Sequence, residues 1–287
     1  NKLEQVHEIL NHKRLDAMIV LSDFNRRYLS GFTGTSGGLI ITHNKNYLVT
    51  DFRYIEQATK QAPEFEIINR QNGLITEIKH ILEQAQLSNI GFEGHHISYD
   101  TYVELNKGMI TLISISDSID KIREVKSEEE IKLIQKAAEI VDKTYDYILT
   151  VVKVGMSERE IKALLESKML ELGADGPSFD TIVASGYRGA LPHGVASDKL
   201  IEKGDMITLD FGAYYRGYCS DITRTFAVGE PDPKMKEIYN IVLSSQIKAI
   251  NEIRPGMTVQ EADALSRDYI DAHGFGPVSY THLRAHE

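Results

Sequence analysis

The residues best placed to do chemistry lie between positions 206 and 228, in the stretch MITLDFGAYYRGYCSDITRTFAV. Apolar and polar residues alternate on both sides of a Gly- and Tyr-rich centre, which predicts two strands joined by a turn. Ile207, Leu209 and Phe211 fall on one face, and Asp210 falls on the other. The stretch therefore predicts a hairpin with a buried apolar face and a polar face that is free for chemistry.

Two carboxylates on the polar face of this hairpin suggest a metal site. With a turn centred between Tyr215 and Arg216, Asp210 would lie directly opposite Asp221. Facing carboxylates destabilise a strand pair unless a cation neutralises them. Carboxylate oxygens suit Mn²⁺, Mg²⁺ or Ca²⁺ better than they suit metals that prefer sulfur ligands. The alternative is a different register with two solvated acids, and the two strands alone do not decide between them.

Bulk composition restricts the class of protein. The chain has 287 residues, enough for two domains, and a net charge of −10 with a pI near 5.5. That charge argues against nucleic acid or an anionic membrane as the main partner. No apolar run approaches the roughly 20 residues of a membrane span, and the first residues lack a signal pattern. A single cysteine, Cys219, excludes an internal disulfide, so we expect a cytoplasmic protein.

Residues 1 to about 120 alternate between helical and extended patterns, which predicts an α/β domain. Helices are expected over 3–13, 52–62, 74–86 and 99–108, with strands at 17–21, 37–42, 46–50, 65–69, 89–93 and 111–116. The Gly-rich stretch Gly31 to Gly38 has neither a P-loop nor a dinucleotide-binding pattern. We therefore expect a loop between two strands there, with no ligand.

The composition changes near residue 121, where charged residues become dense up to Glu130. This run is interpreted as a solvated linker, which gives domains at 1–122 and 123–276. Ser127 and Glu130 have the spacing of a capping box that would open a long helix. The residues expected to face the core of that helix are Ile131, Ile134, Ala138, Val141, Tyr145 and Ile148.

The second part of the chain repeats itself with an offset of 101 residues. The matched positions are Gly155, Met156, Ser157, Glu160, Leu164 and Gly173 in the first copy, and Gly256, Met257, Thr258, Glu261, Leu265 and Gly274 in the second. An amphipathic helix precedes each copy, at 127–152 and about 232–253. Duplication explains the matched helices and glycines better than generic helix capping does.

Four segments give the chain a family resemblance: YLSGFTGTSGG (28–38), TDFRYIEQA (50–58), SGYRGALPHG (185–194) and LDFGAYYRGYCSDITRTF (209–226). Together they resemble the pita-bread metallopeptidases, and within them the bacterial Xaa-Pro aminopeptidases and Xaa-Pro dipeptidases, or prolidases. The resemblance covers residues 1 to about 276. It implies a creatinase-like α/β N-terminal domain, followed by an α+β pita-bread catalytic domain with two pseudo-twofold halves.

The resemblance also implies a site with two divalent metal ions, Mn²⁺ first, with Co²⁺ or Zn²⁺ as alternatives. Asp210 would chelate one metal, Asp221 would bridge both, and Thr223 would donate a hydrogen bond to the site. His193 matches the catalytic histidine that contacts the scissile peptide and the tetrahedral intermediate. Taken alone, a histidine in a Gly- and Pro-bounded loop is more often a surface residue, and its context between the resembling segments favours the catalytic role.

The sequence departs from the family pattern at its end. One histidine in a G-H-G-x-G segment and two later glutamates, one of them the general base, would lie beyond residue 276. Residues 277–287 do not continue the repeat, and HLRAHE lacks the H-E-x-x-H order, so they are interpreted as a non-native tail. We therefore expect an incomplete pita-bread domain that holds metal weakly and is inactive or nearly so.

The function implied by the resemblance is hydrolysis of the bond between an N-terminal residue and proline. The expected partners are Xaa-Pro peptides or dipeptides and further copies of the chain, in a homodimer or higher homo-oligomer, with no nucleic acid and no membrane. The alternatives are a creatinase-type amidinohydrolase that needs no metal, or a peptide-binding module. The presence of both Asp210 and Asp221 argues against these alternatives, because neither of them needs an acidic pair.

Overall fold

The computed structural model describes residues 1–191 and 193–276. It divides into two compact units, Asn1–Ser127 and Glu128–Glu287. The division falls a few residues after the predicted boundary, because helix α6 (Ser118–Glu124) belongs to the first unit. The start of the charged run is thus the end of a helix and not a linker. Ile119 of this helix is buried in the first unit's core, so its apolar side holds it there.

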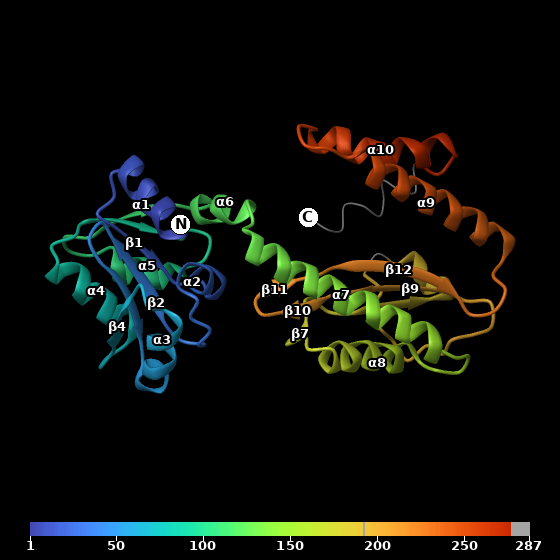
Figure 1. Cartoon of the computed structure of the whole chain (residues 1–287), viewed down its shortest axis with the longest axis horizontal. Helices are drawn as coiled ribbons and strands as arrows, with labels where there is room; N and C mark the ends of the chain where they lie inside the picture. Colours follow the sequence, from blue (N-terminus) through green and yellow to red (C-terminus); the bar gives the residue numbers. More distant parts are fainter. Residues whose placement is uncertain (192, 277–287) are drawn as a thin grey trace. The chain divides into compact units, whose positions relative to one another are not determined.

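The first unit is built on one six-stranded mixed sheet, which confirms the predicted α/β class (Figure 1). The strands, in spatial order, are β4 (Glu66–Asn69), β3 (Asn46–Thr50), β2 (Gly38–Thr42), β1 (Ala17–Val20), β5 (Asn89–Phe92) and β6 (Thr111–Ser114). The pairs β1–β2 and β2–β3 are antiparallel, and the other pairs are parallel. Each predicted strand of this unit is present.

Helices cover both faces of this sheet, as the central strand β1 makes clear. Its four residues are all buried, with Met18 and Val20 in one apolar cluster and Ala17 and Ile19 in another. Side chains of a strand alternate between its faces, so the sheet separates the two clusters. The first cluster includes residues of α1 (Lys2–Lys13), α2 (Asp23–Ser30), α3 (Ile55–Gln61) and α6, and the second includes residues of α4 (Leu74–Gln84) and α5 (Tyr99–Leu105). A short 3₁₀ turn, η1 (Phe52–Tyr54), precedes α3.

The Gly-rich loop follows helix α2 and not a strand, so the prediction for its first flank was wrong. Gly31 ends the helix in the left-handed region with a φ of 80°, a conformation that glycine adopts at little cost. The loop is then held by the buried Arg26, whose guanidinium donates to the carbonyl of Gly34 at 2.6 Å and to that of Gly37 at 2.9 Å. Helix α2 escaped prediction because it buries polar residues, including Asn25, where an apolar stripe would be expected.

The second unit contains two three-stranded sheets with helices packed on them. The sheet orders are β11-β10-β7 and β12-β9-β8. The elements are α7 (Glu128–Val151), α8 (Glu158–Glu171), β7 (Gly176–Pro177), β8 (Ile182–Ser185), η2 (Gly186–Ala190), β9 (Met206–Phe211), β10 (Ala213–Tyr215), β11 (Tyr218–Cys219), β12 (Ile222–Ala227), α9 (Pro233–Glu252) and α10 (Val259–Ala272). Helix α7 contacts β10 and β11, and α8 contacts β7 and β8 (Figure 1).

The predicted core-facing stripe of helix α7 is confirmed in part. Val141 and Ile148 are buried and Tyr145 packs against the core as predicted, whereas Ile131 is 46% exposed. The other buried residues of the helix are Glu130, Ala137, Ile140 and Thr144. Glu130 faces inward because its carboxylate accepts a hydrogen bond from the hydroxyl of Tyr218 at 2.8 Å. An acidic residue near the start of a helix carries no sequence signal for burial, so the spacing of apolar residues did not predict it.

The predicted repeat is confirmed in the helices. Helices α8 and α10 each have 14 residues and start 101 residues apart, and both begin with a capping box, from Ser157 and Thr258. Helices α7 and α9 also end 101 residues apart. The glycines before the caps, Gly155 and Gly256, have φ values of 92° and 93°. Within the described chain, no helix combines the length and apolarity needed to cross a bilayer.

Candidate metal and catalytic site

The hairpin forms as predicted, but its register differs by two residues. Asp210 of β9 pairs with Thr223 of β12, and not with Asp221. The reason is the turn, which consists of Arg216 and Gly217 with φ values of 47° and 89°. Positive φ at both residues is the signature of the two-residue type I′ turn that antiparallel strands favour. The prediction centred the turn between Tyr215 and Arg216, one residue too early, because it did not use the preference of such turns for glycine at the second position.

The two carboxylates are therefore diagonal neighbours and not a facing pair. Asp221 lies in the break between β11 and β12, two residues before Thr223. A spacing of two residues returns to the same face of an extended chain, so we expect Asp221 on the side that Asp210 and Thr223 share. Diagonal neighbours in an antiparallel pair are roughly 7 to 8 Å apart at their Cα atoms. The break itself needs Gly212, because a Cβ at that position would lie 1.9 Å from the carbonyl oxygen of Ser220.

The apolar face of the hairpin is buried as predicted and holds the carboxylates in place. Ile207, Leu209 and Phe211 are all fully buried in the core of the second unit. Asp210 is half-buried, between Thr223 on one side and Ile182 of β8 on the other. The buried face thus fixes the direction in which Asp210 points, which is away from the core.

The carboxylates on the polar side of the hairpin suit a divalent cation. Asp221 is exposed, and it makes no hydrogen bond or ion pair with any residue of the described chain. Carboxylate oxygens are the ligands that Mn²⁺ and Mg²⁺ prefer. Over residues 1–191 and 193–276, no three His, Cys, Asp or Glu side chains lie close enough together to hold a metal ion. The described residues thus bring two candidate acidic ligands here and no complete metal centre.

His193 lies in a turn on the far side of β8 from Asp210. Val195 forms an antiparallel bridge with Ile182, and Ile182 pairs in turn with Asp210. Neighbouring strands are about 4.8 Å apart, so the backbone of Val195, two residues after His193, lies roughly 10 Å from that of Asp210. His193 is exposed, and its carbonyl accepts from the Val195 amide at 2.8 Å. The sheet brings the loop of His193 close to the hairpin, with one strand between them.

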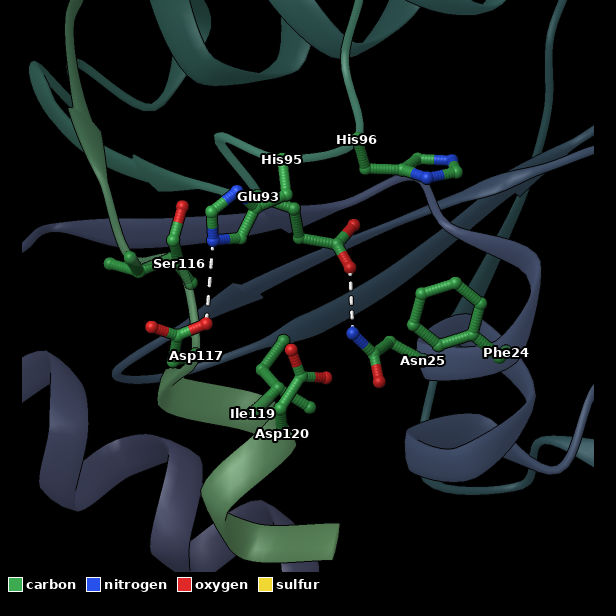
Figure 2. Close-up of a pocket in the computed structure, with 10 residues that line it drawn as sticks. Phe24, Asn25, Glu93, His95, His96, Ser116, Asp117, Ile119 and Asp120 are labelled. Carbon is green, nitrogen blue, oxygen red and sulfur yellow. Dashed lines mark hydrogen bonds and ion pairs between the residues drawn. The ribbon is translucent and has the colours of Figure 1, made fainter. Parts of the chain in front are cut away.

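A small cavity occurs elsewhere, in the first unit, where sequence reasoning expected nothing. Figure 2 shows its lining, which includes Phe24, Asn25, Glu93, His95 and Asp117. Its volume is about 40 Å³, which suffices for a water molecule and not for a peptide. The imidazole Nε2 of His95 lies 3.4 Å from a carboxylate oxygen of Asp117, and both side chains are largely exposed.

The buried carboxylate beside this cavity has a structural role. Glu93 accepts from the backbone amides of Leu21 and Ser22 at 2.7 and 2.9 Å. It also accepts from the Ser22 hydroxyl at 2.5 Å. The Asn25 amide donates to it at 2.8 Å, as Figure 2 shows. These donors lie at the start of α2 and just before it, where an anion is favoured by the helix dipole. Glu93, which directly follows β5, therefore holds the entry to this helix.

Comparison with known families agrees with the two-unit structure. Residues 2–125 match the Creatinase/Prolidase N-terminal domain, and residues 132–286 match Metallopeptidase family M24. The chain belongs to metallopeptidase family M24. This M24 peptidase is therefore a hydrolase and, by family, a metallo-exopeptidase that works with divalent metal ions. The predicted non-native tail, 277–287, lies outside the described residues.

Several relatives are similar over nearly the whole chain. The uncharacterized peptidase YqhT of Bacillus subtilis is 47% identical over 277 residues, which cover 96% of this chain and 78% of the relative. The Xaa-Pro dipeptidase of Pyrococcus horikoshii is 38% identical, with the same coverage. The solved structure of an Xaa-Pro dipeptidase from Bacillus anthracis has a TM-score of 0.93 at 45% identity, covering 96% of this chain and 78% of that one. The fold of the M24 peptidase is thus that of a creatinase-like domain joined to a pita-bread domain.

Proposed function

We propose that this M24 peptidase hydrolyses the peptide bond between an N-terminal residue and a following proline, as an Xaa-Pro dipeptidase or aminopeptidase. The observation that carries the proposal is the hairpin, on which Asp210 pairs with Thr223 and Asp221 precedes Thr223 by two residues. Relatives named Xaa-Pro dipeptidase, 38% and 37% identical to this chain, support the substrate class. We assign Asp210 and Asp221 as metal ligands, and Mn²⁺ as the metal.

Each residue then has a physical role. The half-buried Asp210 and the exposed Asp221 provide negative charge on one face of a rigid hairpin, and Thr223 lies beside Asp210 to orient its carboxylate. When bound, divalent ions would polarise the scissile carbonyl and make a bound water acidic. His193, from its exposed turn, donates a hydrogen bond to the oxygen on which negative charge develops.

The central test measures release of the N-terminal residue from an Xaa-Pro dipeptide, with and without Mn²⁺, using protein expressed from its complete reading frame. Asp221→Asn removes one charge from the proposed site and should lower kcat/KM by at least about 100-fold, or roughly 2.7 kcal/mol. Asp142→Asn is the matched control, because Asp142 is an exposed aspartate on α7 with no partner among the described residues. Equal activity of wild type and Asp221→Asn would refute the metal assignment.

The same assay separates the remaining alternatives. Cleavage of a dipeptide alone indicates a dipeptidase, and cleavage of longer Xaa-Pro peptides indicates an aminopeptidase. Binding of such peptides without cleavage would favour a peptide-binding module, and hydrolysis of creatine without metal would favour an amidinohydrolase. Sedimentation of the same protein tests the expected homodimer or higher oligomer.

Metal binding by the 287-residue chain itself can be measured by calorimetric titration with Mn²⁺. We propose weak binding and little activity, because the described residues bring together two acidic ligands and no third. Tight binding of two Mn²⁺ ions per chain would contradict this. Binding that is the same in wild type and Asp221→Asn would show that the metal lies elsewhere.

A further inference from the structure

A buried carboxylate at the start of α8 organises the loop that carries His193. Glu158 is fully buried, and five donors surround its two oxygens. One oxygen accepts from the amide and the hydroxyl of Ser185, at 2.7 and 2.8 Å. The other accepts from the amide and the hydroxyl of Ser197, at 3.1 and 2.6 Å, and from the guanidinium of Arg188. A carboxylate has about four lone-pair sites, so Glu158 uses its full capacity.

These partners are the two ends and the middle of one segment. Ser185 is the last residue of β8, and Ser197 follows the bridge at Val195. Between them lie η2 and the turn that contains His193. A single side chain therefore closes this loop at both ends, which removes much of its conformational freedom.

Arg188 extends the network to the residues beside His193. Its guanidinium pairs with Glu158 and also donates to the carbonyl of Val195 at 3.0 Å. The amide of Val195 donates to the carbonyl of His193 at 2.8 Å. An unbroken chain of contacts thus leads from the buried carboxylate to the backbone of the histidine.

Beyond this network, the loop is held by the bridge from Val195 to Ile182 and by the buried Ala196, while its large apolar side chains are exposed. Tyr187, Leu191 and Val195 are 79%, 50% and 50% exposed, so their apolar side chains contribute little burial. Where apolar packing is sparse, a satisfied network of charged hydrogen bonds supplies the order.

The repeat provides an internal comparison that separates this role from helix capping. The position equivalent to Glu158 in the second copy is Val259, which is 86% exposed. Helix α10 still begins with a full capping box made by Thr258 and Glu261. The helix start therefore does not need an acid at this position, and the burial of Glu158 serves the loop.

We propose that Glu158, through Arg188, is a positioning residue for His193. It holds residues 186–191 and 193–196 in the conformation that presents His193 beside the hairpin. The inference rests on the proposed function only for the catalytic role of His193, because the ordering of the loop can be measured independently.

The first test is amide hydrogen exchange on the 287-residue chain. Glu158→Gln keeps the size of the side chain and removes the charge, so exchange at 193–197 should rise by at least about tenfold, the effect of one lost charge-assisted hydrogen bond. Glu160→Gln is the matched control: it makes the same chemical change two residues later, at an exposed position where glutamine also completes a capping box. It should leave exchange at 193–197 unchanged.

A milder variant keeps the test valid should Glu158→Gln fail to fold. Arg188→Lys retains the charge but lacks the guanidinium fork that contacts Glu158 and Val195 together. It should raise exchange at Val195 and leave the amides of Ser185 and Ser197 protected. Unchanged exchange at Val195 in both variants would overturn the inference.

The second test measures kcat and KM for an Xaa-Pro dipeptide, with the same variants in protein from the complete reading frame. Both variants should lower kcat more than they raise KM, with Arg188→Lys the milder and Glu160→Gln equal to wild type. The positioning role would be overturned if Glu158→Gln raised exchange in the loop and left kcat unchanged, while His193→Ala lowered kcat. No cleavage by wild type would refute the proposed function alone and leave the exchange result to decide the inference.

Discussion

Helices α8 and α10 have the same length, the same capping box and positions 101 residues apart, yet their surroundings differ. Helix α8 buries Ile161, Leu165 and Met169 against the strands of the second unit, whereas α10 has no buried residue. The preceding helices differ in the same way, since α7 has six buried residues and α9 has Ser245 alone. Within the described residues, α9 and α10 pack mainly on each other.

The difference separates two sources of helix stability. Caps and the glycines that precede them are local, so both copies have them. Burial depends on which strands lie against the helix, and the first copy has the strands β7 to β12 beside it. Most helix stability in proteins comes from packing and not from propensity, so the first copy should be much the more stable.

A matched pair of isoleucines gives the most direct test of the difference in packing between α7 and α9. Ile140 and Ile241 are 101 residues apart, and Ile140 is 1% exposed whereas Ile241 is half-buried. Ile140→Ala should cost about 2 to 5 kcal/mol, because it opens a cavity in the core. Ile241→Ala should cost less than about 1 kcal/mol. Urea denaturation, monitored by hydrogen exchange of the β9 amides, measures the loss in free energy of unfolding for each variant. Equal losses in the two variants would show that α9 is as well packed as α7.

The caps should respond equally in the two copies, with a smaller effect. Ser157→Ala and Thr258→Ala each remove a hydroxyl that accepts from the amide three residues later, at 3.1 and 3.2 Å. Each change should cost about 0.5 to 2 kcal/mol of local helix stability. Amide exchange at Glu160 and Glu261 reports the two losses. A loss confined to one copy would mean that tertiary packing, and not the local motif, holds that helix start.

Acid should weaken the loop that Glu158 holds more than it weakens the start of α10. Burial raises the pKa of Glu158, but the hydrogen bonds from Ser197 and Ser185 outweigh it, so the pKa lies below its ordinary 4.5. Hydrogen bonds from the Thr258 backbone and hydroxyl likewise lower the pKa of the exposed Glu261. A lowered pKa stabilises the fold above the ordinary value, and this stability is lost as the pH falls through the lowered pKa.

Exchange measured between about pH 6 and pH 3 should therefore show loss of protection in the loop 186–197 on acidification. In Glu158→Gln the loop should exchange rapidly at every pH, with no acid step. The change at the start of α10 should be small, because water screens an exposed carboxylate. An acid step that persists in Glu158→Gln would assign the titration to another group.

Sequence patterns predicted much of this protein because the signals were local. Alternation at Ile207, Leu209 and Phe211 identified the buried face of the hairpin, and the spacing of 101 residues identified the repeated helices. The four segments identified the M24 family, together with its two-domain fold. The roles of His193, Asp210 and Asp221 stay predictions that the assays above can test.

The failures have specific physical causes. Helix α2 was missed because it buries the polar Arg26 against loop carbonyls 8 and 11 residues away. Glu130 of α7 was missed because its partner, Tyr218, lies 88 residues away. The register of the hairpin was wrong although its signal was local, because the turn residue Gly217 and its positive φ were not used to place the turn.

The sequence by itself determined where the capped helices α8 and α10 begin and which strand face of the hairpin is apolar, since each depends on neighbours within a few residues. It also showed that one unit is repeated. Only the tertiary structure decided which acids are buried and what they hold. Glu158 reaches partners 27 to 39 residues away, and no spacing along the chain marks it. A buried charge is tolerated only where the fold brings enough donors to it, and that depends on how distant segments meet.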